Sequence, residues 1–330
     1  MFSRSRFRKY FSLSLSKFLQ MRLNSFLFRW LPFAVSRYYL ATLGELYYLL
    51  HWREKRLIRQ TVAHVFRPKL APEDLEEKIR DTFTGIFDHY HEKLFTAYSH
   101  FKRLLKFLQH KIRLAGEEQL QEALAAGKGV ILVTGHYGAV EFLPGALAVN
   151  GYPAAMICRF QTNRLRDSLT WRARAVGLEL IDADDGNIIL AAMKALKAGR
   201  ILITECDEFD EWRLDPHRQS YFLGCQMPGD RSLDILRKRS GAPVITALVE
   251  RHGCQSYTLN LTPVMNGADP ASASEECLQV LEAAIEAHPE QWYQWKKFGK
   301  MIKSRLEVEN DRQESGYLAP EVGISVADQA

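Results

Sequence analysis

The 330-residue sequence lacks paired cysteines and long apolar runs. Its five cysteines, at positions 158, 206, 225, 254 and 277, are scattered without a Cys-x-x-Cys pair. This scattered pattern argues against a disulfide framework and against a cysteine-based zinc site. It favours a reducing compartment. Before residue 60 no uncharged run exceeds seven residues, whereas a spanning helix needs about 20 mostly apolar residues. We therefore expect neither a conventional membrane span there nor a secretory signal peptide.

Several catalytic motifs are also missing. The chain contains no G-x-S-x-G elbow, no Walker loop and no H-E-x-x-H pair, so a serine-hydrolase elbow, a P-loop and a zincin site are not indicated. We expect no metal and no resident cofactor. The apolar fraction of 47% and the charged fraction of 25% are those of an ordinary globular protein, which excludes a fibrous or wholly disordered chain.

Positive charge is concentrated at the front of the chain. Residues 1–70 carry fourteen Lys and Arg against two acids, although the whole chain has a net charge of only +5. Such a basic segment indicates an anionic partner, either nucleic acid or a phospholipid surface. The same segment is rich in Phe, Tyr, Trp and Leu, a composition typical of helices that lie in the membrane interface. We predict membrane association and no nucleic-acid partner; the alternative is a helical layer packed on the core.

The centre of the chain alternates short β-rich runs with helical ones. The predicted strands are 129–134, 154–159, 178–181, 200–204, 243–250 and 256–262, with the last two as a hairpin, and the predicted helices between them are 139–149, 163–176, 187–198 and 230–240. This alternation predicts an α/β fold whose mainly parallel sheet is flanked by helices.

Three parts of the chain are expected. Residues 1–70 form a basic, aromatic-rich, helical membrane-associating segment, and residues 71–305 form the α/β domain. The domain begins with a helical region at 72–109 and ends with helices in 273–305, interrupted at Pro289. Residues 306–330 hold six acids and one Arg and are predicted to be a disordered tail.

The segment Gly129–Glu141, GVILVTGHYGAVE, is the strongest candidate for a site. An apolar strand ends at Thr134, and the carboxyl edge of such a strand is where open α/β sheets bind ligands. Here His136 and Glu141 predict a dyad in which the carboxylate accepts Nδ1–H and leaves Nε2 as a general base. The alternative is that His136 caps a helix and Glu141 is a solvated helix residue.

Other strand ends carry further candidates. Arg159 is expected to face the same edge as His136 and to bind a phosphate, the alternative being a surface ion pair. Asp207 and Glu208 are expected to pair with an Arg of the site or to hydrogen-bond a sugar or polar headgroup of a bound ligand, the alternative being a capping or salt-bridge role. The flanking glycines, Gly138 among them, would let a bulky ligand approach the backbone. Trp292 and Trp295 are spaced for packing in the core.

An ordered set of blocks resembles the bacterial late acyltransferases of lipid A biosynthesis, within the wider lysophospholipid-acyltransferase group. The blocks are GHYGAVE with its H-x-x-x-x-E box, ICRF followed by WRARAVGLELI, MKALKAGRILITECDE, YFLG followed by RSLDILRKRSGAPVITALVER, and HPEQWYQWKK. They extend the resemblance over roughly residues 30–305. The family's Asp-Gln pair stands here as Asp207–Glu208, and the clean N-terminal span of several members is replaced by the basic, aromatic segment.

The resemblance implies transfer of a fatty acyl group to a hydroxyl of a lipid or glycolipid, such as a lipid A precursor. The donor would be a thioester of acyl carrier protein or coenzyme A, and the place the cytoplasmic face of a bacterial inner membrane. His136 and Glu141 would be the catalytic pair, with no covalent acyl-enzyme. The alternatives are an acyltransferase for a lysophospholipid or another acceptor, and a lipid-binding protein of the same fold without activity.

Overall fold

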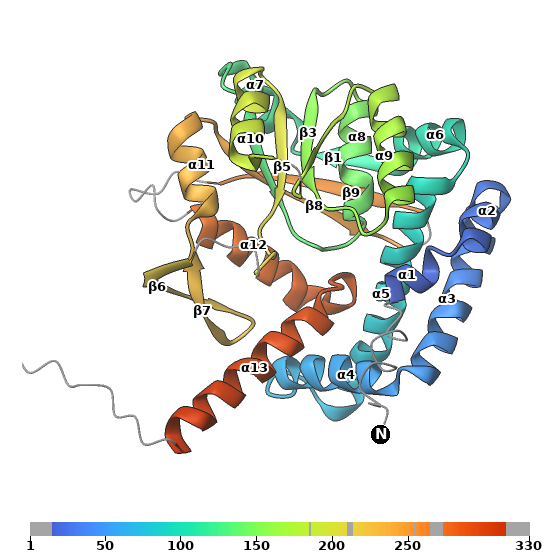
Figure 1. Cartoon of the computed structure of the whole chain (residues 1–330), viewed down its shortest axis with the longest axis vertical. Coiled ribbons are helices and arrows are strands. Elements are labelled where there is room, and N and C mark those ends of the chain that lie inside the picture. Colours follow the sequence, from blue (N-terminus) through green and yellow to red (C-terminus); the bar gives the residue numbers. More distant parts are fainter. Residues whose placement is uncertain (1–14, 185, 210–213, 254, 265–272, 315–330) are drawn as a thin grey trace, which may run out of the picture.

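A seven-stranded sheet forms the centre of the molecule. The computed structural model describes residues 15–184, 186–209, 214–253, 255–264 and 273–314 (Figure 1). The strand order is β1-β9-β8-β2-β5-β3-β4, and only the β8–β9 pair is antiparallel. The strands are β1 (Ile112–Ala115), β2 (Val130–Thr134), β3 (Ala154–Cys158), β4 (Glu179–Asp182), β5 (Ile201–Glu205), β8 (Val244–Arg251) and β9 (Tyr257–Pro263). The predicted α/β class with a mainly parallel sheet is confirmed.

All six predicted strands belong to this sheet, and the predicted hairpin is the β8–β9 pair. Two features were not predicted: the short edge strand β1, and a separate two-stranded hairpin of β6 (Leu214–Phe222) and β7 (Cys225–Asp230). Both strands of that hairpin contain a proline and several polar residues. They therefore lack the apolar alternation from which strands are recognised.

Helices connect most of the strands and extend the chain at both ends (Figure 1). They are α1 (Leu15–Leu19), α2 (Arg22–Trp30), α3 (Phe33–Leu50), α4 (Trp52–Phe66), α5 (Pro72–Tyr98), α6 (Phe101–Lys111), α7 (Glu117–Ala125), α8 (Leu143–Val149), α9 (Asn163–Ala175), α10 (Ile188–Lys197), α11 (Ser232–Ser240), α12 (Ala273–Ala287) and α13 (Trp295–Glu314). Short 3₁₀ turns precede α8, at Val140–Phe142, and follow α12, at Pro289–Gln291. The predicted break at Pro289 thus separates α12 from α13.

The sheet buries a separate apolar layer on each face. In β2, Ile131 and Val133 pack into a cluster with residues of α10 and α11, whereas Val130 and Leu132 pack into the larger cluster with α5, α6 and α8. Successive side chains of a strand point to opposite faces, and helices cover both faces, so every residue of β2 is buried. A strand buried on both sides reads as a continuous apolar run, as VILVT does.

The N-terminal helices form a layer with two different faces. Phe28, Phe33, Tyr47 and Tyr48 are buried in the larger core cluster, and α2 and α3 contact α5. Other large apolar side chains of the same helices are exposed, among them Phe26 and Trp30. The expected helical segment is therefore present from residue 15 onward, and it is also a packed layer on the domain; residues 1–14 lie outside the described part.

Within the described residues, no helix combines the length and apolarity that a membrane span requires. At the other end of the chain, α13 continues to Glu314. The disordered tail was expected to begin at 306, so the first part of that segment is helical. Residues 315–330 lie outside the described residues.

Two close backbone contacts fix the loop after β2 and the segment before α13. A Cβ at Gly85 of α5 would lie 1.6 Å from the carbonyl oxygen of Glu290, and one at Gly138 would lie 1.8 Å from that of Val249. Gly138 also has a φ of +55°, which glycine adopts without strain. Only glycine fits at these two positions.

A buried ion pair holds the same region from the other side. The guanidinium of Arg251 donates to both carboxylate oxygens of Glu92, at 2.7 and 3.2 Å, and to the carbonyl oxygen of Gly138 at 2.7 Å. The Glu92 side chain is 1% exposed and that of Arg251 is 9% exposed. The pair therefore connects α5, β8 and the loop that carries His136.

We expect Glu92→Gln to lower the free energy of unfolding by about 3–5 kcal/mol, because it leaves the buried guanidinium of Arg251 without its counter-charge. Urea unfolding of the purified chain measures this. The matched control is Glu45→Gln, which breaks the exposed pair with Lys55 and should cost less than about 1 kcal/mol. Equal losses in the two variants would contradict the assigned role of the buried pair.

Candidate active site

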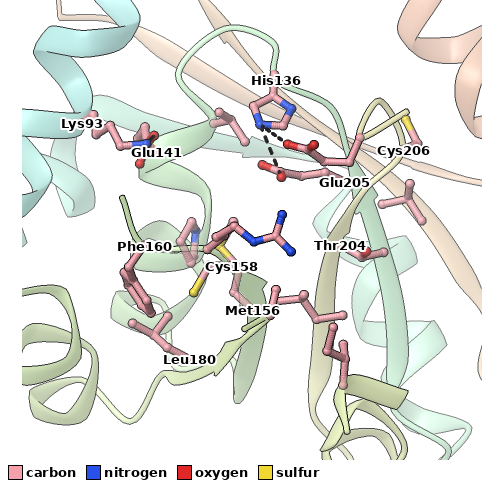
Figure 2. A pocket seen from close by; sticks show the side chains of 18 of the residues that line it. Lys93, His136, Glu141, Met156, Cys158, Phe160, Leu180, Thr204, Glu205 and Cys206 are labelled. Atoms are coloured by element: carbon pink, nitrogen blue, oxygen red, sulfur yellow. Dashed lines mark ion pairs between the residues drawn. The ribbon is translucent and has the colours of Figure 1, made fainter. Parts of the chain in front are cut away.

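His136 lies at the carboxyl edge of the sheet, in the loop that follows β2 (Figure 2). The buried strand ends at Thr134, and the chain then turns so that the His136 carbonyl oxygen accepts a hydrogen bond from the Tyr293 amide. The histidine side chain is 9% exposed and lines a cavity. The structure therefore confirms that His136 lies at the end of a strand, beside a pocket.

Asp207, just after β5, holds the histidine ring. Its carboxylate accepts a hydrogen bond from His136 Nδ1 at 2.8 Å and from the His136 amide at 3.0 and 3.2 Å. The indole N–H of Trp292 donates to the same carboxylate at 2.8 Å. Burial alone would raise the pKa of Asp207, but the imidazole and these donors lower it. An ionised Asp207 fixes the proton of the neutral ring on Nδ1, so Nε2 carries the lone pair.

The opposite nitrogen of the ring faces two more carboxylates. His136 Nε2 is 3.4 Å from Glu205 Oε2 and 3.2 Å from Glu208 Oε1. Burial favours the neutral imidazole, but the carboxylates of Glu205, Asp207 and Glu208 outweigh it and raise the pKa of His136 to about 9. Burial raises the pKa of Glu205 to about 7, against the opposing effect of His136.

Glu141 does not accept a hydrogen bond from His136 Nδ1, and that part of the sequence prediction is wrong. Its carboxylate lies 3.1 Å from Lys93 Nζ and 3.6 Å from His89 Nε2, both on α5, and Figure 2 shows Glu141 beside Lys93. The physical reason is that the chain after His136 does not form one helix. Gly138 turns with a positive φ and a 3₁₀ turn follows, so the two side chains do not share a helical face.

The other predicted site residues have different surroundings. Arg159 and Glu208 line the cavity; Arg159 donates to Asp184 at 2.8 Å, and Glu208 accepts from Lys297 at 2.5 Å. Asp207 is fully buried and is not among the lining residues that the structure describes. Its hydrogen bonds to His136 correspond to the alternative of a salt-bridge role. Gly138 likewise packs on Val249 instead of lining the cavity.

The cavity beside His136 has a volume of about 990 Å³, at the upper end of the usual range of roughly 300–1,000 Å³ for ligand pockets. Much of its wall is apolar. The apolar lining comes from α6, α8, β3, α9, α10, α11 and α12, and Met156 and Leu180 are visible in Figure 2. A chamber of this size and polarity suits a hydrocarbon chain.

Cationic side chains line part of the same cavity. They are Lys93, Arg159, Arg172, Arg218, Lys296, Lys297 and Lys300. Lys297 contacts Glu208, and Lys93 contacts Glu141. Guanidinium and ammonium groups beside an apolar chamber match an amphiphile with a phosphate-bearing polar part.

Sequence reasoning missed several residues of the site. Trp292 and Trp295 are fully buried, as predicted, but the hydrogen bond from Trp292 to Asp207 was not foreseen. Tyr293 stacks on His89 and meets the His136 ring edge-on, with ring centroids 5.0 Å apart. Glu205 was also missed, although its place at the end of β5, next to β2 in the sheet, is a signal that could have found it.

One group in the described part of the chain has the composition of a metal site. The donor atoms of His136, Glu205 and Glu208 all lie within 4.8 Å of one another. A metal at this place was not predicted, because the three residues do not follow a known ligand spacing.

Chemically, the arrangement combines a fixed imidazole, a buried carboxylate behind it and an apolar cavity in front of it. When neutral, the ring can take a proton at Nε2 from a hydroxyl in the cavity, and the carboxylate of Asp207 stabilises the imidazolium that results. The site therefore fits proton abstraction from a hydroxyl group held in the cavity.

Comparison with known proteins agrees with this chemistry. No curated protein matches the chain. Residues 15–297 match the profile of the family described as bacterial lipid A biosynthesis acyltransferase, and the match includes the N-terminal helices, the whole sheet and the segment that holds Trp292. The chain belongs to the bacterial lipid A biosynthesis acyltransferase family.

Proposed function

We propose that this protein transfers a fatty acyl group from a thioester to a hydroxyl of a lipid or glycolipid, such as a lipid A precursor. The observation that supports it best is the hydrogen bond from His136 Nδ1 to the buried Asp207 beside an apolar cavity of about 990 Å³. The donor would be the thioester of acyl carrier protein or coenzyme A. We expect the reaction to need no metal or resident cofactor.

The proposed reaction uses one base. Neutral His136 takes the proton of the acceptor hydroxyl at Nε2 while the oxygen attacks the thioester carbonyl carbon. A C–O bond forms, the C–S bond then breaks, and the proton held by His136 passes to the departing thiolate. Asp207 keeps the ring in the required tautomer and stabilises the imidazolium. No serine or cysteine nucleophile takes part.

The polar groups around the base have distinct proposed tasks. Glu141 remains in the proposed site as the partner of Lys93 at the cavity wall, although it does not orient His136. Arg159 and the lysines of α13 are proposed to bind phosphates of the acceptor or of the donor's phosphopantetheine arm, because guanidinium and ammonium groups pair strongly with phosphate. Glu208 is proposed to contact the acceptor's polar part.

The exposed face of the N-terminal helices supports peripheral binding to a membrane. Most of the exposed large apolar side chains in the described structure come from residues 21–52; they are Met21, Leu23, Phe26, Trp30, Val35, Tyr38, Leu46, Leu49, Leu50 and Trp52. The guanidinium of Arg29 lies 5.6 Å from the Trp30 ring, and that of Arg53 lies 5.5 Å from the Trp52 ring. This pairing of cations with interfacial aromatics suits an anionic lipid surface. We propose that this surface is the cytoplasmic face of a bacterial inner membrane.

His136→Ala should reduce the rate of acyl transfer by about 10²–10⁴-fold, because it removes the general base. The measurement is thioester consumption and acyl-ester formation, with folding checked by circular dichroism. His288→Ala is the matched control, since His288 is half exposed and contacts Glu250 and Glu290 on the surface; its rate should be unchanged.

Asp207→Asn extends the same series, because an amide can no longer fix the ring with its proton on Nδ1. We expect a loss of a similar size, by the logic of Ser-His-Asp triads. Near-wild-type turnover in His136→Ala would contradict the mechanism. A wild-type protein that binds lipid but consumes no thioester would instead favour an inactive lipid-binding protein.

The rate should rise with pH, because only the neutral imidazole accepts a proton and the pKa of His136 is raised to about 9. We expect kcat/KM to increase from pH 7 to about pH 9 and then level off, measured with a chelator present and corrected for spontaneous thioester hydrolysis. Glu205→Gln removes a carboxylate that favours the imidazolium, so the rising limb should move to lower pH. A limb that stays in place in this variant would contradict the electrostatic account.

Replacing Phe26 and Trp30 together by Ser should weaken binding to anionic phospholipid vesicles by at least about tenfold, because each buried aromatic contributes roughly 1.5–3 kcal/mol. Flotation with liposomes measures this. The control is Trp171→Ser, since Trp171 is similarly exposed but belongs to α9. Unchanged vesicle binding, together with salt-sensitive nucleic-acid binding, would overturn the membrane assignment.

A further inference from the structure

The outward nitrogen of His136 and two glutamates form a compact set of three donors. His136 Nε2 lies 3.4 Å from Glu205 Oε2 and 3.2 Å from Glu208 Oε1, and all three donor atoms lie within 4.8 Å of one another. Figure 2 shows Glu205 reaching from the end of β5 toward His136. The three side chains come from two adjacent strand ends, β2 and β5, so the rigid sheet holds them together.

These separations match the edges of a tetrahedral zinc site. Zinc binds histidine nitrogen at about 2.0–2.1 Å and carboxylate oxygen at about 2.0–2.2 Å, which puts neighbouring ligands of a tetrahedron about 3.3–3.5 Å apart. The two measured separations from Nε2 are 3.4 and 3.2 Å. An ion could therefore contact His136 and both glutamates with only small movements of their side chains.

Two of the three donor side chains have hydrogen-bond partners that orient them, as the ligands of metal sites usually have. Asp207 accepts the hydrogen bond of His136 Nδ1 at 2.8 Å, which leaves Nε2 as the ligand atom and fixes the ring plane, as in carboxylate–histidine–zinc sets. Lys297 Nζ donates to Glu208 Oε2 at 2.5 Å, so Glu208 presents its other oxygen to the histidine. Both ligands are oriented by partners that a metal would not displace.

The local charge also favours a cation. Glu205, Asp207 and Glu208 bring three carboxylates to one imidazole, in a place where the histidine is 9% and Glu205 18% exposed. Carboxylates that share a partly buried site repel one another, and a dication between two of them reduces that repulsion. The cavity in front of the three residues leaves room for a fourth ligand.

We propose that His136, Glu205 and Glu208 bind Zn²⁺, with a water molecule or another small ligand in the fourth position toward the cavity. The bound ion occupies Nε2, the atom that takes the proton in the proposed acyl transfer, so zinc inhibits that reaction. Binding of the metal stands independently of the proposed function; only the inhibition rests on it.

Zinc binding is tested directly on the full-length purified chain. The chain is treated with EDTA, dialysed and titrated with ZnCl₂ by calorimetry. One zinc ion should bind per chain, and Glu205→Gln and Glu208→Gln should each weaken binding by at least about tenfold, because each removes a charged ligand atom. His288→Ala is the matched control. Nε2 of His288 faces Glu250 and Nδ1 faces Glu290, so the two carboxylates do not lie beside the same ring nitrogen as they do at His136. The zinc affinity of this variant should be unchanged.

Zinc X-ray absorption spectroscopy separates this site from binding to thiols, such as those of the free cysteines Cys158, Cys206 and Cys277. Nitrogen and oxygen ligands at about 2.0–2.2 Å are expected. A zinc–sulfur distance of about 2.3 Å, the lack of saturable binding, or zinc affinity in both glutamine variants equal to that of the wild-type chain would each overturn the proposed site.

The inhibitory consequence has its own measurement. Saturating zinc should abolish acyl transfer, and EDTA should restore the rate. Zinc bound at the site with an unchanged rate would overturn the inhibition while leaving the metal site intact. A chain that binds zinc as expected but transfers no acyl group without it would contradict the proposed function and not the metal site, so the two failures are distinguishable.

Discussion

Three donors meet on the buried carboxylate of Asp207, and the geometry of the site depends on them. The His136 ring and amide come from the loop after β2, and the Trp292 indole comes from the segment before α13. The carboxylate is buried, so water could not replace any of these hydrogen bonds if it were lost. The loss of one bond would therefore destabilise the site. One side chain thereby ties two strand ends to a distant part of the chain and fixes which nitrogen of His136 faces the cavity.

The same region is held from the side of α5. Arg251 joins Glu92 to the carbonyl oxygen of Gly138, and Gly85 lets α5 approach the backbone of Glu290. The helices that carry the exposed apolar residues pack on α5, so the proposed membrane-binding face and the loop that carries His136 share one rigid element. The exposed apolar face of these helices and His136 at the sheet edge are thus kept in a fixed relation.

The fold and the position of His136 were predictable because each follows from local patterns. Buried strands such as VILVT and helices between them specify a mainly parallel sheet, and a histidine just after a strand lies at its carboxyl edge whatever the rest of the chain does. The β6–β7 hairpin was not predictable in this way, since its strands carry prolines and polar residues. The exact partner of His136 was also beyond local reasoning, because Gly138 and a 3₁₀ turn interrupt the expected helix.

The sequence by itself determined the α/β class, the strand that presents His136, the basic and aromatic front, and the family to which its ordered blocks point. These are consequences of periodicity, composition and neighbouring residues. Only the tertiary structure decided that Asp207, and not Glu141, holds the His136 ring. It also decided that Glu205 and Glu208 face Nε2 and that Glu141 forms an ion pair with Lys93. Such pairings join residues far apart in the chain, and they are set by strand order and by the packing of α5 and the C-terminal segment against the sheet edge, which no short stretch of sequence encodes.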